Sequence, residues 1–273
     1  MGVNMDVSLQ NKYQSLKTYL ASLGSAVVAF SGGVDSGLVA VVAHQALGER
    51  MLAVTLQSPV ETPDGVQAAI QVARQFGFPH RVMPYDDLEK HTFVENTPER
   101  CYFCKRERLG LLVELAKQAG FSAVLEGSNV DDLQDYRPGK RAVNELGVLS
   151  PLIEAGLTKD EVRALSRELE LPVWNRPSAP CLATRFPYGM RITREGLERV
   201  ARGEEFLKNL GFTLVRVRDY GTMARLEVSP EQVTELVARR EQVHAFFRSL
   251  GYAHVAVDLL GYRSGSLNEG VVK

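Results

Sequence analysis

The stretch Ser31-Gly32-Gly33-Val34-Asp35-Ser36 decides the fold class of this chain. It follows an apolar run at 26–30 and precedes an apolar helical pattern at 37–43, so it forms a turn between a strand and a helix. Two adjacent glycines let backbone N–H groups surround an anion, and the helix N-terminus adds its dipole at the same place. The hydroxyls of Ser31 and Ser36 can donate to phosphate oxygens, and Asp35 can hold a metal or cap the helix.

This glycine loop differs from two common nucleotide motifs. It lacks the Gly-Lys-Ser/Thr ending of a P-loop and the spacing of the GxGxxG dinucleotide fingerprint. It resembles the SGGxDS pyrophosphate loop of the PP-loop ATP pyrophosphatases, which activate their substrates by adenylation. A glycine-rich turn without a ligand is the alternative.

The surrounding pattern predicts an α/β fold with a doubly wound parallel sheet. Helical patterns alternate with four apolar, β-rich runs, at 26–30, 52–56, 81–85 and 123–125. Thr62-Pro63 predicts the start of a helix that continues over 66–76, and Thr158 with Glu161 has capping-box spacing before a helix at 162–169. Ligands of such sheets bind at the carboxyl ends of the strands, where the glycine loop lies.

An acidic segment, 126–132, follows the fourth predicted strand and is expected at the same edge of the sheet. Gly127 allows a nucleotide to approach closely, and the carboxylates of the segment, Asp131 among them, are candidate ligands for magnesium. Read alone, the segment is equally consistent with a solvated acidic turn.

The pattern changes beyond the proline-rich segment 172–187. We predict helices at 193–210 and 230–250 and strands at 213–218, 224–228 and 254–259, which together form a small α+β domain. The expected division is therefore a nucleotide domain over 1–178, a cysteine-bearing linker over 179–190, and a substrate-binding or oligomerisation domain over 191–273.

The length and charge balance of the chain argue against some classes of binding partner. The chain has 273 residues, with 32 Lys and Arg against 33 Asp and Glu, and its formal net charge is -1. This balance argues against bulk electrostatic binding to nucleic acid or an anionic membrane. The first twenty residues include Lys12 and Lys17 and no long apolar stretch, so we expect neither a signal peptide nor a spanning helix, and a cytoplasmic location.

The three cysteines, Cys101, Cys104 and Cys181, are too few for a disulfide framework. The first two open a predicted helix that runs to 119, where the helix dipole favours thiolate. Three thiolates can ligate three irons of a 4Fe-4S cluster and leave the fourth iron open. A zinc site, a thioredoxin-like dithiol, and unrelated small apolar side chains are the alternatives.

Several motifs together resemble the LarE family, the sulfur-inserting enzymes of nickel-pincer nucleotide cofactor biosynthesis. The glycine loop alone identifies only the PP-loop superfamily, with its adenine nucleotide alpha hydrolase-like fold, and the later motifs are more selective. They are EGSNVDDLQDYRPG at 126–139, SPL at 150–152, APCLATRFPYG at 179–189, VRVRDYGTMARLEV at 215–228, and the terminal LLGYRSGSLNE.

The resemblance implies an ATP-dependent sulfur transferase. Its substrate would be pyridinium-3,5-biscarboxylic acid mononucleotide, whose carboxylates are adenylated with ATP and magnesium and then converted to thiocarboxylates. Adenylation makes chemical sense because an acyl adenylate carries a good leaving group for attack by sulfur, whereas a carboxylate cannot lose oxide.

The resemblance also implies roles for single residues. Asp35 and Cys181 would be catalytic, and Glu204 and Glu227 are weaker candidates for a second metal or a subunit contact. Arg216 and Arg218 lie two apart on a predicted strand, so they share a face that could clamp the substrate phosphate or be merely solvated. The binding residues implied are Ser31, Gly32, Gly33, Asp35, Ser36, Gly127 and Asp131 for ATP, and Arg185, Arg216 and Arg218 for the substrate.

The cysteine pair departs from family members that carry a lone cysteine at the Cys181 position and sacrifice its sulfur. Similar members with three cysteines assemble a 4Fe-4S cluster, which favours Cys101, Cys104 and Cys181 as iron ligands here. The sacrificial version, in which Cys181 donates its own sulfur, is the alternative. The resemblance further implies a sulfur donor or desulfurase partner and a trimeric or hexameric homo-oligomer.

Three other functions compete with this one. A tRNA thiolase of the same superfamily can combine a pyrophosphate loop with three cysteines, although the near-neutral charge argues against a nucleic-acid substrate. An amidating ligase similar to NAD synthetase would use the cysteines only structurally. A nucleotide-sensing scaffold would bind ATP without releasing pyrophosphate.

Overall fold

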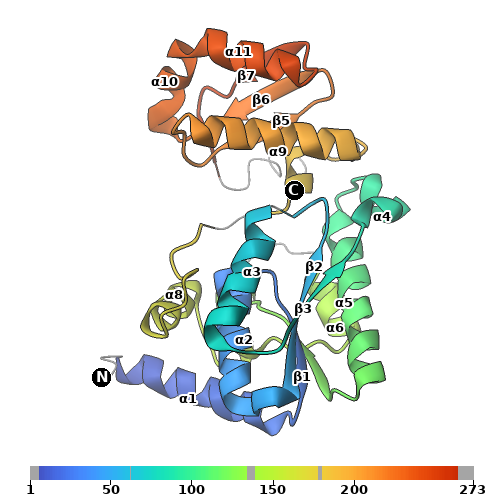
Figure 1. Cartoon of the computed structure of the whole chain (residues 1–273), viewed down its shortest axis with the longest axis vertical. Coiled ribbons are helices and arrows are strands. Elements are labelled where there is room, and N and C mark those ends of the chain that lie inside the picture. The colour runs from blue at the N-terminus through green and yellow to red at the C-terminus, as the bar shows by residue number, and fades with distance from the viewer. Residues whose placement is uncertain (1–5, 62, 134–138, 178–179, 264–273) are drawn as a thin grey trace. The chain divides into compact units, whose positions relative to one another are not determined.

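The computed structural model describes residues 6–61, 63–133, 139–177 and 180–263 (Figure 1). The chain forms two compact units: Met1–Asp86 with Cys101–Ala179, and Asp87–Arg100 with Pro180–Lys273. Residues 87–100 therefore belong to the second unit although they lie in the N-terminal half of the sequence, and no sequence pattern predicted this.

The first unit is built on a parallel sheet, which confirms the expected α/β fold class. Its strand order is β3-β2-β1-β4, and β1 pairs with β2 from Ala26↔Met51 to Ala29↔Val54. All four predicted strands are present. Their bounds are β1 (Ala26–Ala29), β2 (Met51–Gln57), β3 (His80–Pro84) and β4 (Ala123–Leu125).

Helices cover both faces of this sheet (Figure 1). Adjacent residues of β1 point to opposite faces, so Val28 packs with α1, α2, α3 and α8 while Val27 packs with α5 and α6. The helix bounds in this unit are α1 (Val7–Ser22), α2 (Val34–Leu47), α3 (Pro63–Phe76), α5 (Arg100–Ala119), α6 (Gly139–Glu145), α7 (Pro151–Glu154) and α8 (Lys159–Glu168), with short 3-10 turns η1 (Gly48–Arg50) and η3 (Val130–Leu133).

Helix starts follow local sequence chemistry. The predicted capping box is present at α8, where the Glu161 N–H donates to Thr158 Oγ1 (3.3 Å) and the Thr158 N–H donates to Glu161 Oε2 (2.9 Å). The predicted cap at Thr62 lies outside the described residues, as do parts of the motifs at 126–139, at 179–189 and at the C-terminus. No helix in the described ranges is long and apolar enough to cross a membrane.

The second unit carries a smaller sheet of order β5-β6-β7, in which β5 and β6 are antiparallel and β6 and β7 are parallel. Its apolar core includes Val200, Val217 and Phe247, all fully buried. The bounds are η2 (Asp87–Glu89), α4 (His91–Val94), η4 (Leu182–Arg185), α9 (Arg194–Asn209), β5 (Arg216–Asp219), β6 (Met223–Glu227), η5 (Pro230–Gln232), α10 (Val233–Ala238), α11 (Arg240–Ser249) and β7 (His254–Val257).

One prediction for this unit is wrong, because the single helix expected at 230–250 is divided. Arg239 interrupts it with a backbone outside the helical region (φ −94°, ψ 18°), so α10 ends directly before this residue and α11 begins directly after it. The Arg239 guanidinium donates to the Leu210 carbonyl and to Glu235 Oε1. These contacts tie the interruption to the end of α9.

Candidate functional site

The glycine loop is held closely against α3, and Gly32 explains why. Gly32 has φ +76°, and a Cβ there would lie 2.2 Å from the Gly65 carbonyl oxygen and 2.9 Å from the Ala69 nitrogen. Both the conformation and the space therefore require glycine. Gly33 follows in extended conformation as the N-cap of α2.

The loop's two serines bond to each other and close the turn. Ser31 Oγ and Ser36 Oγ are 3.0 Å apart, and Ser36 Oγ accepts from the Ser31 N–H at 3.2 Å. The loop is thus preformed at the start of the 14-residue α2, where free N–H groups and the helix dipole favour an anion.

A cavity of about 570 Å³ opens at this loop, a size typical of small-molecule sites. Apolar side chains from β1, β2 and α5 form part of its wall, and polar groups form the rest. Six of the residues predicted to bind nucleotide or metal line it, namely Ser31, Gly33, Asp35, Ser36, Gly127 and Asp131. Glu126 and Asp132 of the predicted acidic segment also line it. Four lining residues with charged side chains were not predicted, namely Glu61, Lys105, Arg108 and Lys159.

Gly127 brings the segment after β4 against the glycine loop. A Cβ at Gly127 would lie 2.8 Å from the Ser36 nitrogen and 3.1 Å from Ser36 Cα. Because these are backbone atoms of α2's first turn, a side chain at 127 would push the two loops apart. The close approach that this glycine permits is therefore one between two protein backbones.

Asp35 lies at the centre of a polar group in the cavity. Its carboxylate accepts from Asn129 Nδ2 at 3.1 Å and forms an ion pair with the Lys159 ammonium. The Lys159 backbone N–H donates to Asp131 Oδ2 at 2.8 Å. Lys159 therefore contacts both carboxylates predicted to lie near the nucleotide or its metal.

Another carboxylate of the cavity, the buried Glu126, directly follows β4. It accepts from Lys105 Nζ (2.9 Å), from the Ser128 hydroxyl (2.8 Å) and from the Ser150 hydroxyl. Burial alone would raise the pKa of Glu126, but the charge of Lys105 and these hydrogen bonds outweigh it and hold the pKa below its ordinary value. Ser150 belongs to the SPL motif, so this contact gives that motif a structural role.

Helix α5 supplies one wall of the cavity through side chains three and four residues apart. Lys105 and Leu112 both line it, as does Arg108, whose Nη1 donates to Glu61 Oε1 at 2.5 Å. The Arg108 guanidinium also lies 5.6 Å from the centre of the Tyr85 ring. Together with Lys159, these side chains place three cations around the cavity.

The cysteine pair occupies the first turn of the same helix. Cys101 is exposed and Cys104 is half-buried, and the residue after Cys104 is Lys105, which lines the cavity. Cys181 is half-buried in the second unit, directly before η4. Among the described residues, no group of three or more His, Cys, Asp or Glu side chains is gathered so that it could hold a metal ion.

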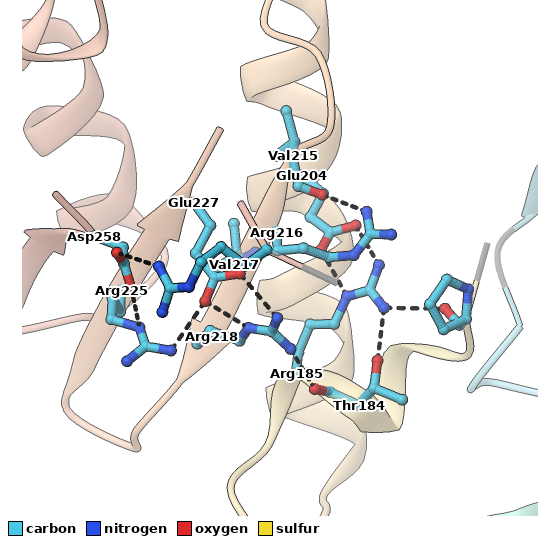
Figure 2. A network of polar contacts seen from close by, with 12 residues as sticks. Thr184, Arg185, Glu204, Val215, Arg216, Val217, Arg218, Arg225, Glu227 and Asp258 are labelled. Carbon is cyan, nitrogen blue, oxygen red and sulfur yellow. Dashed lines mark hydrogen bonds and ion pairs between the residues drawn. The ribbon is translucent and has the colours of Figure 1, made fainter. Parts of the chain in front are cut away.

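The predicted substrate arginines lie in the second unit, in a network of ion pairs (Figure 2). Arg185 donates through Nε and Nη2 to both oxygens of Glu204, at 2.7 and 3.0 Å. Arg218 donates in the same two-pronged way to Glu227, at 2.9 and 2.8 Å. All four side chains are buried, so these pairs hold β5, β6, α9 and η4 together.

The same arginines hold the segment that follows Cys181. Arg185 Nη1 donates to the Cys181 carbonyl at 3.3 Å, and Arg218 Nη1 donates to the Thr184 carbonyl at 2.7 Å. Arg185 and Arg218 therefore fix the backbone beside the cysteine.

Arg216 differs from its neighbours. Its Nη1 donates to the Val215 carbonyl at 2.7 Å (Figure 2). Its guanidinium lies 4.9 Å from the centre of the Tyr262 ring. No carboxylate of the described residues forms an ion pair with it. Burial, together with repulsion from Arg185, lowers the pKa of Arg216 despite the attraction of Glu204. An anionic ligand would relieve this repulsion.

The sequence of this chain is similar to those of known proteins. Residues 8–183 match the family model described as NAD synthase. The chain is 41% identical over 267 residues to the uncharacterized protein slr1717 of Synechocystis, covering 97% of this chain and all of that relative. It is 35% identical to the pyridinium-3,5-bisthiocarboxylic acid mononucleotide synthase of Lactiplantibacillus plantarum, covering 97% of each chain. It is 27% identical to the tRNA-specific 2-thiouridylase MnmA of Trichlorobacter lovleyi, over 63% of this chain and 58% of that one.

Proposed function

Because the chain belongs to the LarE family of pyridinium-3,5-bisthiocarboxylic acid mononucleotide synthases, with a nucleotide domain of the NAD synthase type, we propose that it is an ATP-dependent sulfur transferase. Its substrate would be pyridinium-3,5-biscarboxylic acid mononucleotide, whose carboxylates become thiocarboxylates. The observation that carries this proposal is the course of α5, which has two cysteines in its first turn and then supplies Lys105 and Arg108 to the nucleotide cavity.

The first step would be adenylation. A carboxylate oxygen of the substrate attacks the α-phosphorus of ATP, and pyrophosphate leaves. The N–H groups at the start of α2 and the cations of Lys105, Arg108 and Lys159 would stabilise the charge that develops on the pyrophosphate. The apolar wall of the cavity suits the adenine base.

The polar group around Asp35 also suits magnesium. Asp35 and Asp131 are oxygen ligands at the edge of the cavity, and Asp35 already accepts a cation, the Lys159 ammonium. These two carboxylates would hold magnesium together with the ATP phosphates, and the bound ion would neutralise phosphate charge.

The second step would replace AMP by sulfur. Sulfide attacks the acyl carbon, and AMP leaves with the former carboxylate oxygen, so the products are a thiocarboxylate, AMP and a proton. Three cysteine side chains, two of them three residues apart at the start of α5, suit a 4Fe-4S cluster with one open iron. Such a cluster, held by Cys101, Cys104 and Cys181, would supply a further sulfide for repeated turnovers.

The second unit would bind the anionic substrate. Arg216 would contact its phosphate, since this guanidinium has no carboxylate ion pair among the described residues, and Arg185 and Arg218 would shape the surrounding site. A sulfur donor or desulfurase partner and assembly into trimers or hexamers are further proposals that rest on the family resemblance.

One experiment tests the reaction. Anaerobically purified enzyme is given ATP, magnesium, the substrate and sulfide, and pyrophosphate and the thiocarboxylate are measured together. We expect both products from the unaltered enzyme, and pyrophosphate with little thiocarboxylate from Cys181→Ser. Thiocarboxylate formation by a variant with all three cysteines changed to serine would refute sulfur transfer through them. A product that contains nitrogen when ammonia replaces sulfide would instead indicate an amidating ligase.

Two alternatives give different signatures in the same preparation. A decrease in intact mass by the elements of hydrogen sulfide after a single turnover, located at Cys181, would indicate the sacrificial mechanism, in which the cysteine sulfur passes to the substrate and dehydroalanine remains. The similarity to a tRNA-specific 2-thiouridylase keeps RNA as a candidate substrate. Tight tRNA binding in a gel shift, weakening steeply with salt, would favour that function.

A further inference from the structure

Residues 87–100, here called the strap, contain three buried polar side chains that the proposed reaction does not use, those of Asp87, Asn96 and Arg100, and the last two lie nearest in sequence to Cys101. Asn96 is 0% exposed and Arg100 is 1% exposed. Both belong to the second unit, together with the segment that follows Cys181. Burying an amide and a guanidinium is costly unless their hydrogen bonds are made, so their partners indicate what they do.

Asn96 forms hydrogen bonds to residues 186–189 through both its side chain and its backbone. Its Nδ2 donates to the Pro187 carbonyl at 2.7 Å and to the Phe186 carbonyl at 3.2 Å. Its own carbonyl accepts from the Gly189 N–H at 2.9 Å. Asn96 therefore fixes the path of residues 186–189.

The backbone of Asn96 lies in the left-handed region, with φ +52°. Glycine and asparagine are the residues that adopt this conformation most readily. Glycine would satisfy the backbone but could not make the amide bonds to Phe186 and Pro187. These bonds give a reason for asparagine in particular at this position.

Arg100 forms hydrogen bonds both to Asn96 and to a residue close to Cys181 in sequence. Its Nη1 donates to Asn96 Oδ1 and to the Ala183 carbonyl, the latter at 2.9 Å. Ala183 is two residues beyond Cys181. Arg100 is also joined by a peptide bond to Cys101, so its backbone sets where that cysteine begins.

The segment after Cys181 is therefore held by two sets of contacts within the second unit. The strap contacts it through Asn96 and Arg100, and Arg185 contacts it through the Cys181 carbonyl. The Cys181 carbonyl also accepts from the Thr184 N–H at 3.0 Å and from its hydroxyl at 2.9 Å. No residue of the strap besides Arg100 is adjacent in sequence to a cysteine.

We propose that Asn96 and Arg100 are positioning residues of the sulfur centre. They fix the backbone next to Cys181 and the residue next to Cys101, and thereby set how these two thiols are presented for iron or for sulfur transfer. The inference rests on the proposed function, because it assigns Cys101 and Cys181 to one reaction.

The test uses the full-length protein with two substitutions. Asn96→Gly keeps the left-handed backbone and removes the amide, and Arg100→Lys keeps a cation while removing the two-partner geometry. Arg106→Met is the matched control, because Arg106 is an exposed residue of the same helix. Both variants are expected to fold, which thermal unfolding checks.

The first readout needs no cluster. In iron-free, reduced protein, the rate of iodoacetamide alkylation is measured for each cysteine by peptide mass spectrometry. We expect the rates at Cys101 and Cys181 to change several-fold in Asn96→Gly and Arg100→Lys and to stay unaltered in Arg106→Met. Unchanged rates at both cysteines in folded variants would overturn the proposal.

The second readout uses the reconstituted protein. Changing groups that support metal ligands lowers metal affinity by roughly 10- to 100-fold, so we expect iron loss to a ferrous chelator to be about tenfold faster in both variants. ATP affinity, measured by calorimetry, should stay at the value of the unaltered protein, because the cavity lies in the first unit. If the unaltered protein binds no iron, the cluster part of the proposed function fails, and the alkylation rates still decide the role of the strap.

Discussion

The ammonium group of Lys159 pairs with the carboxylate of Asp35 inside the nucleotide cavity. Lys159 is the first residue of α8, and Asp35 lies in the first turn of α2, so the contact joins two helix starts that are 124 residues apart in sequence. In the structure the lysine holds the carboxylate that we assign to magnesium. ATP phosphates would offer the same lysine a stronger set of acceptors.

Lys159→Met therefore tests the phosphate-binding role. Losing a charge-assisted hydrogen bond costs about 1.5–3 kcal/mol, so the Kd for ATP should rise roughly 10- to 100-fold. Calorimetric titration of ATP measures it, and Lys117→Met, which changes an exposed lysine of α5, is the control. An unchanged Kd would remove Lys159 from the nucleotide site.

Gly127→Ala tests the contact between the two loops of the cavity. The new Cβ would meet the Ser36 backbone at 2.8 Å, so the glycine loop must move and ATP binding should be lost. Gly110→Ala is the matched control, since nothing lies within 4 Å of its added Cβ. In the interior of α5 that control should stabilise the fold by about 0.5–1 kcal/mol. Normal ATP affinity in Gly127→Ala would contradict the contact.

The pH dependence of stability tests the Glu126 network. Because the pKa of Glu126 is lower in the folded protein than its ordinary value of 4.5, the ionised form stabilises the fold above pH 4.5, and this contribution is lost as the pH falls below that value. The stability difference between the unaltered protein and Glu126→Gln should therefore shrink on acidification. Urea unfolding at a series of pH values measures it. Glu107→Gln, an exposed change on α5, should show no such trend.

Replacing Arg218 should mainly lower the stability of the fold, whereas replacing Arg216 should mainly weaken substrate binding. Arg218→Ala leaves Glu227 buried with only Arg225 as an ion-pair partner among the described residues, and breaking a buried pair costs about 3–5 kcal/mol. Arg216→Ala breaks no ion pair of the described residues, so it should mainly raise the KM for the mononucleotide. Chemical unfolding and steady-state kinetics separate the two effects. The opposite pattern would reverse the assignment of structural and binding arginines.

Much of the nucleotide unit is predictable because its signals are local. Four apolar runs became the four strands, and the spacing of Thr158 and Glu161 gave the capping box. The glycine loop could be read from six residues, since the conformation of Gly32 and the helix start at Gly33 depend on near neighbours.

The lysines of the cavity were not predicted from the sequence, because the carboxylates with which they form ion pairs are distant in sequence. Lys105 pairs with Glu126, and Lys159 pairs with Asp35, across 21 and 124 positions. In each helix these lysines look like solvent-facing residues. The only local signal is the spacing of Lys105, Arg108 and Leu112, which places all three on one face of α5.

The strap and the buried arginines were unpredictable for the same reason. Asn96 contacts carbonyl groups about 90 residues away, and Arg185 meets Glu204 on a different element. A sequence pattern shows that Arg216 and Arg218 share a strand face, but not that Arg218 is already bound to a carboxylate.

The central claim is that three cysteines serve one sulfur-transfer reaction. The most direct measurement is iron and acid-labile sulfide per chain after strictly anaerobic purification, with an absorbance spectrum and the intact mass of the same sample. We predict about four irons per chain, as a 4Fe-4S cluster requires, with loss of iron in Cys101→Ala. Absence of iron after reconstitution, with a decrease in intact mass by the elements of hydrogen sulfide at Cys181 after turnover, would contradict this account.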